Sequence, residues 1–354
     1  MKKSELIFFG GHTELPLDRF IENVLYNKHQ GYYVKKKPFG KKGDFITSPG
    51  ISFLFSEMLS LWIFSLWEHL NQPKNFNIVE LGPGNGELCR VLIKTAKKFP
   101  VFYDSLNIFL YEKSKSLKLL QKKNINEKKL TWINDFSKIK KGPTIFLGNE
   151  FFDSIPIKQF VKINQKIYEK FVIIKKKKIT FSLKKVSKKK VEELNKFNLL
   201  KNFSFIEYPK LGIKELEKII KSIKRLSGGI ILIDYGFLKQ ENTDTIQSVK
   251  NHKNNNLFEN IGEADITSLV NFSLLRNVLL SKNLMVNNVV SQSFFLKKMG
   301  ILKRAEILSQ TMNFKEKSDL YYRLERLLSS KYMGELFKVI CAFKIKKNFL
   351  LGFK

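Results

Sequence analysis

The stretch that most constrains the fold is residues 77–88, an apolar run followed by three alternate glycines. The short apolar run that ends at Glu80 indicates a parallel strand, and the glycines stand at positions 82, 84 and 86. Apolar residues at 88, 91, 92 and 96 then recur at helical spacing, so a helix follows the turn. A strand, a glycine turn and a helix in this order aim backbone N–H groups at whatever lies over the turn.

The spacing of these glycines disfavours a dinucleotide site, which uses G-x-G-x-x-G beneath a pyrophosphate. Glu80 precedes the first glycine by two residues, where it would repel a phosphate but could face a cation or a hydroxyl. The pattern E-x-G-x-G-x-G resembles motif I of class I S-adenosylmethionine (SAM) methyltransferases, whose loop holds an amino acid and a ribose. A ligand-free turn and a phosphate site are the alternatives. The resemblance implies cofactor contacts at Glu80, Gly82, Pro83, Gly84 and Gly86.

The composition allows either one large domain or two modest ones, because the chain has 354 residues of which 43% are hydrophobic. A net charge of +32 favours anionic partners such as nucleic acid or an acidic membrane surface. However, most of the 64 basic residues are lysines spread along the chain, which indicates a compositional drift of the whole proteome. Arginine, the side chain best suited to bidentate recognition of phosphate or guanine, is scarce.

Cysteine and histidine usage gives no sign of a metal site. Cys89 and Cys341 are far apart in the chain, which favours a reducing compartment, and the four histidines are scattered. The first nine residues lack the apolar run of a signal peptide and the arginines of a transit peptide. From this we expect a cytoplasmic, bacterial protein without a transmembrane segment.

The N-terminal 74 residues are expected to form short helices around a long loop. Leu15–Asn27 indicates a helix, and residues 31–49 form a polar, glycine-rich segment in which Asp44 and Thr47 could fold over a bound cofactor. A plain surface connection is the alternative. Residues 51–70 are apolar nearly all round but contain Glu57, which favours a helix buried against the sheet over a membrane span.

Two later strands also end in acidic residues. Residues 106–112 form a strand with Glu112 at its tip, where an acid accepts hydrogen bonds from ribose hydroxyls. Residues 130–135 form the next strand, and Asp135 lies either near an adenine or in a solvated turn.

The fourth strand, residues 144–149, leads into the predicted reaction site. Asn149, Glu150 and Asp153 follow one another at its carboxyl end, where ligands bind in open parallel sheets. Two acids there could hold a cationic substrate or accept its proton. For Asp153, a role as a helix cap is the alternative.

Residues 158–203 change in character and are expected to form an inserted, β-rich, basic lobe. Stretches 159–163 and 179–183 alternate as antiparallel strands do, and residues 186–198 suggest a basic helix. The lysine runs at 175–178 and 188–190 indicate solvated turns, or else a docking surface for an acidic protein or nucleic acid.

The remainder is expected to complete the main sheet. Strands are predicted at 204–209, 228–236, 284–290 and 337–343, with an amphipathic helix at 213–226. The loop at 244–267 carries His252, which is either a general base or a structural histidine. The predicted organisation is an N-terminal extension (1–74), a first half of the sheet domain (75–157), the insert (158–203) and a second half (204–354).

Taken together, the motifs resemble the MidA family, known in mitochondria as the complex I assembly methyltransferases. The matching pieces occur in family order and cover nearly the whole chain. They are Gly31-Tyr32-Tyr33, Pro38-Phe39-Gly40, residues 43–49, residues 80–86, residues 149–153, Asp234-Tyr235-Gly236, residues 244–247, His252, Gly262, residues 264–267 and residues 333–339.

The resemblance implies an α/β fold: a Rossmann-like, seven-stranded class I methyltransferase sheet with inserted elements. It also implies methyl transfer from SAM to a protein arginine, in the mitochondrial members on the 49-kDa-type subunit of respiratory complex I. Gly82, Gly84, Gly86 and Glu112 would hold SAM, and residues 149–153 would line the acceptor site. Glu150 is the first candidate for the proton acceptor, Asp153 the second and His252 the third.

One departure from the family concerns the insert, where Tyr168-Glu169-Lys170 replaces a Trp-x-Glu-Arg-like piece. The extra lysines there leave the protein partner open. Two other functions fit parts of the sequence: an RNA methyltransferase, motivated by the net charge, and a non-catalytic complex I assembly factor that keeps the SAM fold.

Overall fold

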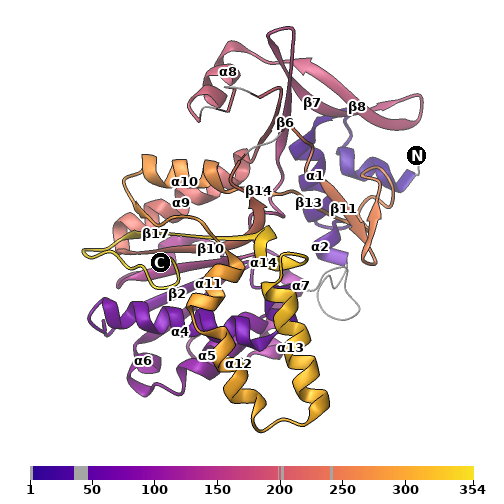
Figure 1. The fold of residues 1–354 in the computed structure, drawn as a ribbon. Coiled ribbons are helices and arrows are strands. Elements are labelled where there is room, and N and C mark those ends of the chain that lie inside the picture. Colours follow the sequence, from indigo (N-terminus) through magenta and orange to yellow (C-terminus); the bar gives the residue numbers. More distant parts are fainter. Residues whose placement is uncertain (1–2, 36–46, 198, 201–202, 240–241) are drawn as a thin grey trace. The chain divides into compact units, whose positions relative to one another are not determined.

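The computed structural model describes residues 3–35, 47–197, 199–200, 203–239 and 242–354 (Figure 1). The chain divides into two compact units. The first comprises residues 1–45, 152–216 and 239–278, and the second comprises residues 46–151, 217–238 and 279–354. Residues 1–45 of the N-terminal extension, the insert and the 239–278 segment therefore share one unit, whereas residues 46–74 belong to the second, a grouping that the predicted boundaries did not contain.

The second unit is built on a mixed sheet whose main path, among the described residues, runs β15-β17-β10-β5-β2-β3-β4. The strands are β2 (Phe76–Leu81), β3 (Leu106–Tyr111), β4 (Leu130–Ile133), β5 (Thr144–Asn149), β10 (Gly228–Phe237), β15 (Met285–Val286), β16 (Val290–Ser291) and β17 (Phe337–Lys344). Strands β10, β5, β2, β3 and β4 are parallel, whereas β17 is antiparallel to β10 and β15.

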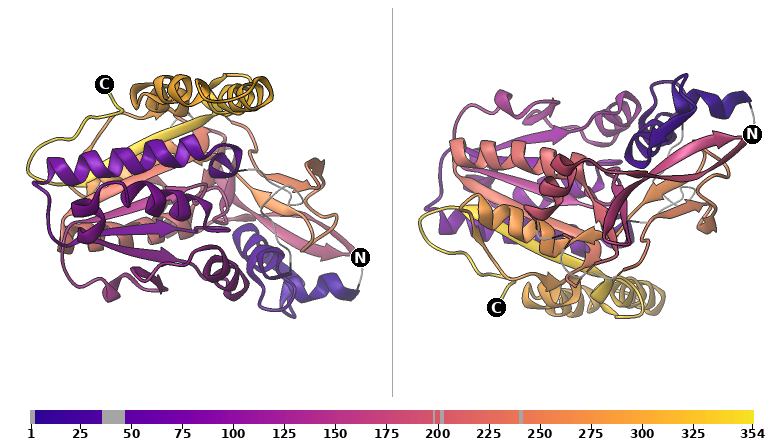
Figure 2. Two further views of the ribbon diagram at one scale, coloured as in Figure 1. Left: turned by 90° about the horizontal axis from the view of Figure 1, so that it is seen from below. Right: turned by 90° about the horizontal axis from the view of Figure 1, so that it is seen from above.

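Helices cover both faces of this sheet (Figure 2). In Figure 1, α4 and α5 lie below the sheet and the second half of α9 lies above it. The helices of this unit in the described residues are α3 (Ser48–Ile51), α4 (Phe53–His69), α5 (Glu87–Ala96), α6 (Pro100–Ser105), α7 (Lys115–Asn124), η2 (Phe136–Lys138), α11 (Gln292–Lys298), α12 (Ile301–Ser309), α13 (Phe314–Leu328) and α14 (Met333–Leu336). Helix α9 (Lys210–Leu226) begins in the first unit.

The apolar helix expected at residues 51–70 is present as α4 and is preceded by the short helix α3. Ser52 separates the two, because its backbone is extended at φ −150° while its hydroxyl accepts a hydrogen bond from the Leu54 N–H. Trp62 is fully buried and its ring stacks near Phe343 of β17, with centroids 6.1 Å apart. The helix is apolar all round because it lies in the core, and no helix of the described chain is long and apolar enough to span a membrane.

Glu57, the buried acid of α4, is neutralised by a partner from α12. Its carboxylate is buried and accepts two hydrogen bonds from Arg304, at 2.8 Å from Nε and 3.0 Å from Nη2. Lys98 lies further away, with Nζ 3.6 Å from Oε1. A bidentate arginine therefore allows an acid to lie in an otherwise apolar helix.

Replacement of Arg304 by alanine should lower the free energy of unfolding by about 2–3 kcal/mol, because it leaves a buried carboxylate with a distant partner. Urea denaturation measures this. Lys303→Ala is the matched control, since Lys303 pairs with Glu306 on the exposed side of the same helix and should change stability by less than about 0.5 kcal/mol. Equal losses in the two variants would contradict this role for Arg304.

The first unit contains a five-stranded antiparallel sheet and a separate three-stranded sheet. Its elements in the described residues are η1 (Lys3–Phe9), β1 (Glu14–Pro16), α1 (Leu17–Tyr26), α2 (Tyr32–Lys35), β6 (Lys158–Ile163), β7 (Lys166–Lys175), β8 (Lys178–Lys185), α8 (Lys188–Asn195), β9 (Phe205–Tyr208), β11 (Gln247–Lys250), β12 (Lys253–Asn255), β13 (Asp265–Thr267) and β14 (Val270–Asn271). Helix α10 (Phe272–Ser281) ends in the second unit.

A small core of its own holds this unit together. Phe9, Phe20 and Tyr32 are fully buried there, and Val172 of β7 and Ile266 of β13 pack against them. The N-terminal helices, the insert and the 239–278 segment thus share one apolar cluster.

One strand assignment from the sequence is wrong. Residues 204–209 were expected in the main sheet, but β9 pairs with β6 of the insert, Phe160 opposite Ile206. Buried polar contacts fix this register: Gln159 Nε2 donates to Glu207 Oε1 at 2.9 Å, and Glu207 also accepts from Thr245. The main sheet continues instead from β5 directly to β10.

Candidate functional site

The glycine turn after β2 takes the conformation that its sequence predicts. Gly82, Gly84 and Gly86 all have positive φ, at 62°, 55° and 83°, and Gly86 is the N-cap of α5. The Gly86 N–H donates to the carbonyl of Pro83 at 2.8 Å, which closes the turn. Positive φ is strained for residues with a side chain, so this backbone path requires glycine.

Neighbouring side chains also leave little room for a Cβ atom at two of these positions. A Cβ at Gly82 would lie 3.0 Å from the ring of Phe151, and one at Gly86 would lie 2.6 Å from Ile125 Cδ1. Apolar side chains therefore pack closely against the turn, which itself carries no side chain at either glycine.

Gln121 of α7 joins the glycine turn to the tips of two strands, although no motif in the sequence indicated this role. Its Nε2 donates to the Gly84 carbonyl at 2.8 Å and to Glu112 Oε2 at 3.2 Å. Its Oε1 accepts from Trp132 Nε1 at 2.9 Å. The side chain is fully buried, so these contacts fix Glu112 relative to the turn.

Glu112 follows the last residue of β3, as predicted, and is buried. Burial raises its pKa, and hydrogen bonds from Ser114, Gln121 and the backbone of Lys113 oppose that shift. A carboxylate has about four acceptor positions, so Glu112 can accept further hydrogen bonds from a bound hydroxyl.

Glu80 is a buried acid of the second unit with an unsatisfied carboxylate oxygen. It is 4% exposed, and within the described part of the chain its Oε2 has no hydrogen-bond partner. Burial, and then the charge of Glu112, raises its pKa to about 8. A buried carboxylate without a partner is costly, so this position suits a ligand that brings a positive charge or a donor.

Asn149 and Glu150 lie at the carboxyl end of β5. Glu150 Oε1 accepts from the Ser48 N–H and from Asn149 Nδ2, each at 3.0 Å. Glu150 has φ +52°, an unfavourable value for a residue with a side chain, and its N–H donates to the Ile233 carbonyl at 2.9 Å. The Oδ1 atom of Asn149 is buried and lacks a hydrogen bond from any described residue. Strain of this kind gathers at functional sites.

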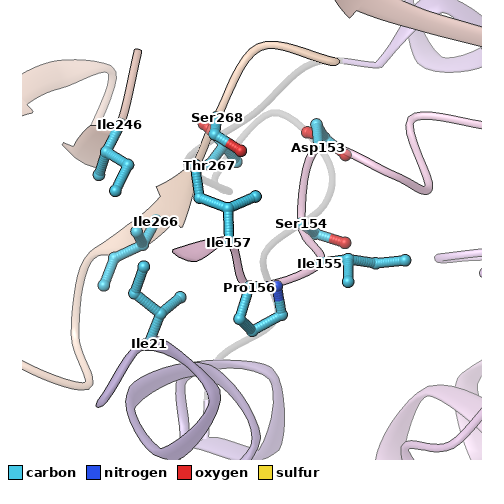
Figure 3. Close-up of a pocket in the computed structure, with 10 residues that line it drawn as sticks. All are labelled: Ile21, Asp153, Ser154, Ile155, Pro156, Ile157, Ile246, Ile266, Thr267 and Ser268. Atoms are coloured by element: carbon cyan, nitrogen blue, oxygen red, sulfur yellow. The ribbon is translucent and has the colours of Figure 1, made fainter. Parts of the chain in front are cut away.

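Asp153 belongs to the first unit and lines a small pocket (Figure 3). The lining residues are Ile21, Asp153, Ser154, Ile155, Pro156, Ile157, Ile246, Ile266, Thr267 and Ser268. Its cavity volume is about 10 Å³, which is about the room one water needs. The pocket is therefore too small to hold a cofactor. A turn and then β6 follow Asp153, so it caps no helix.

Two tyrosines and a second aspartate, not predicted as site residues, occur in the same unit. Tyr33 donates to Asp265 Oδ2 at 3.1 Å and stacks on Tyr26 at 5.3 Å between ring centroids. Tyr26 donates to the Ser154 carbonyl at 3.1 Å. Burial, then the charge of Asp265, raises the pKa of Tyr33 well above its ordinary value. Tyr33 and Asp265 belong to the family pieces at 31–33 and 264–267, whereas no motif in the sequence indicated Tyr26.

The remaining predicted residues lie as follows. Asp135 is exposed and caps η2, where hydrogen bonds from Ser137 lower its pKa, as in a turn. Thr47 precedes α3 without a capping hydrogen bond, and Asp44 lies outside the described residues. His252 is exposed at φ +61° in the hairpin turn between β11 and β12, a geometry that explains it as a turn residue.

The structure thus brings Glu80, the three glycines, Glu112, Asn149 and Glu150 together in the second unit, whereas Asp153 and His252 belong to the first. Within the described ranges, no three His, Cys, Asp or Glu side chains are grouped so that they could hold a metal ion.

Comparison with known proteins gives matches over most of the chain. A family model described as "Putative S-adenosyl-L-methionine-dependent methyltransferase" matches residues 58–290. A solved structure of a COG1565 superfamily member from Burkholderia thailandensis, bound to S-adenosyl-homocysteine, is similar with a TM-score of 0.83. The likeness covers 99% of this chain and 92% of that chain at 21% identity, and so supports the fold.

Curated relatives are similar in sequence over comparable lengths. Protein arginine methyltransferase NDUFAF7, mitochondrial, of Homo sapiens is 29% identical over 346 residues, covering 90% of this chain and 77% of the relative. The Caenorhabditis elegans homolog is 29% identical over 347 residues, covering 91% and 81%. These relatives are named as mitochondrial proteins, so the prediction of a cytoplasmic location is wrong.

Proposed function

Because the chain belongs to the family of S-adenosyl-L-methionine-dependent methyltransferases, we propose that it methylates an arginine side chain of another protein. The observation that carries this proposal is the placement of Glu150 at the carboxyl end of β5, where Ser48 and Asn149 hold its carboxylate in a strained backbone conformation. The names of the curated relatives support an arginine as the acceptor.

The residues around the glycine turn fit SAM. Glu80 has a buried carboxylate oxygen without a partner among the described residues, which suits the ammonium of the methionine part. Glu112 can accept hydrogen bonds from ribose hydroxyls. The turn at Gly82 and Gly84 has a left-handed backbone without side chains, and Gln121 holds it in place. When bound, SAM supplies a methyl group on a positively charged sulfur.

Glu150 has the chemistry that an arginine acceptor needs. A guanidinium is almost always protonated, so its nitrogen can attack only if a proton leaves as the new N–C bond forms. In the proposed reaction Glu150 orients the guanidinium by charge-assisted hydrogen bonds and takes that proton on its carboxylate. Ser48 and Asn149 fix the carboxylate, and correct positioning supplies much of the rate. Asp153 is the second candidate for the same role.

The acceptor protein follows from the resemblance alone. The MidA family and its mitochondrial members lead us to propose the 49-kDa-type subunit of respiratory complex I, or a similar protein. The more general proposal is that the acceptor is an arginine of another protein. The choice of this subunit is the more specific proposal, and it is the one to be tested.

The direct test is incubation of the full chain with tritiated SAM and the purified subunit, followed by mass spectrometry. We expect a gain of one or two methyl groups on one arginine, and no label when that arginine is replaced by lysine. Label on added RNA, with none on protein, would replace the proposal with the RNA methyltransferase. Binding of the subunit without any transfer would favour a non-catalytic assembly factor.

A further inference from the structure

Strand β8 forms an outer edge of the five-stranded sheet. It pairs with β7 along its whole length, from Lys175 opposite Lys178 to Tyr168 opposite Lys185. In the part of the chain that the structure describes, β8 pairs with no other strand. An unpaired edge of eight residues is long enough to accept a further strand.

The hydrogen-bonding groups of this edge can be assigned from the ladder. The Val186 N–H donates to the Ile167 carbonyl at 3.0 Å, and this pair continues the β7–β8 register. In an antiparallel ladder every second residue turns its N–H and C=O toward the partner. Residues 178, 180, 182 and 184 therefore face β7, whereas residues 179, 181, 183 and 185 present their backbone groups to the open side.

Side chains along the edge provide apolar contacts for an incoming strand. Phe181 is 38% exposed and Leu183 is 43% exposed, and both lie on the same face as Ile179. The Phe181 ring packs against Phe258, with ring centroids 4.8 Å apart, and against the Lys170 ammonium, which lies 4.1 Å from the centre of the Phe181 ring. Apolar side chains beside open backbone groups are what strand addition uses for specificity.

The surroundings of the edge are strongly basic. Residues 158–203 contain fifteen lysines and three glutamates, with no arginine or aspartate. Lys184 pairs with Glu14, but no carboxylate of the described residues pairs with Lys178 or Lys185 at the ends of the strand. Like charges on facing strands repel, so this edge disfavours a second copy of itself and favours an acidic strand.

We propose that β8 is a docking strand for an extended, acidic segment of a partner protein, one that alternates acidic and apolar residues. The partner would add to the sheet through residues 179, 181, 183 and 185, place its apolar side chains against Phe181 and Leu183, and pair its carboxylates with the surrounding lysines. A nucleic acid would meet the lysines but has no backbone N–H and C=O ladder to offer the edge. The proposal does not depend on the reaction proposed above.

Fluorescence anisotropy of a fluorescein-labelled, eight-residue peptide of alternating Glu and Val tests this with the full chain. We expect saturable binding at low salt that weakens about tenfold when alternate amides of the probe are replaced by esters, because the esters lack N–H donors. Leu183→Pro should weaken binding of the intact peptide by a similar factor, since it removes a donor from the open side and leaves the β7 ladder in place.

Charge is tested with a matched pair of variants. Lys185→Glu, on the edge, should weaken binding at least about fivefold, whereas Lys140→Glu, an exposed lysine of the other unit, should have little effect. Circular dichroism and thermal melting show whether each variant is folded. The ester probe leaves the protein unchanged, so it decides the question even if Leu183→Pro unfolds.

Three results would overturn the proposal. One is equal affinity for the ester and amide probes, which would mean attraction by charge alone. Another is absence of binding at millimolar peptide. The third is a single-stranded RNA that displaces the peptide and binds Leu183→Pro as well as the unaltered chain, which would make the basic lobe a nucleic-acid surface.

Discussion

Replacement of Glu150 by glutamine should reduce methyl transfer by roughly a thousandfold and leave the affinity for S-adenosylhomocysteine within about twofold. The amide keeps an oxygen that can accept from Ser48 and Asn149, so the local geometry persists. What it loses is the negative charge that orients a guanidinium and the capacity to take its proton. Transfer is measured by label incorporation, and binding by calorimetry.

The comparison variant is Asp153→Asn, which removes the charge of the second candidate. If Glu150 is the proton acceptor, Asp153→Asn should lose much less activity. A larger loss in Asp153→Asn would transfer the role to Asp153. If Glu150→Gln no longer bound S-adenosylhomocysteine, Glu150 would belong to the cofactor site, and the proposed role would be wrong.

Replacement of Glu80 by glutamine should have opposite effects on stability and on cofactor affinity. Burial raises the pKa of Glu80 to about 8 from 4.5, so between these values the folded chain holds a proton that the unfolded chain has lost. Stability therefore falls as pH rises through this window, and the loss is complete above pH 8. Since glutamine carries no charge, Glu80→Gln should be more stable than the unaltered chain at high pH.

The expected gain is roughly 2–5 kcal/mol at pH 8.5, shrinking toward zero near pH 5. Urea denaturation without ligand at both pH values measures it. At pH 8.5, Glu80→Gln should bind S-adenosylhomocysteine at least about tenfold more weakly than the unaltered chain does, because the ligand ammonium loses its carboxylate partner.

Glu68→Gln serves as the control, since Glu68 is an exposed acid on α4 of the same unit. It should change neither quantity. A Glu80→Gln variant that binds the ligand as tightly as before would exclude Glu80 from the cofactor site. A pH-independent stability difference would exclude the raised pKa.

The sequence predicted the parts of the site that depend on local pattern. The glycine turn, Glu80 and Glu112 lie at the positions predicted from the ends of the strands and from the spacing of the glycines. The position of each depends on residues that are close in the chain. The same holds for Glu150 after β5. Gln121 could not be predicted, since its role depends on Gly84 and Trp132, which are distant in sequence.

Strand pairing was less predictable than strand position. Residues 205–208 were correctly expected to be a strand, but their partner is β6 of the insert, which no local pattern specifies. Strand β7 was not predicted, because its run 171–174 is continuously apolar and shows no alternation. In the structure neither face of this run is exposed: Val172 is buried and its neighbours at 171, 173 and 174 are half-buried, so the usual alternation is absent.

The place of β17 has a consequence for biosynthesis. This strand lies between β10 and β15, although it is the strand of the sheet that leaves the ribosome last. While the nascent chain is shorter than about residue 344, β10 lacks its pairing with β17, and the buried helix α4 lacks its contact with Phe343. The sheet is therefore completed only after β17 has been synthesised. Until then the incomplete chain exposes apolar surface that a chaperone would have to cover.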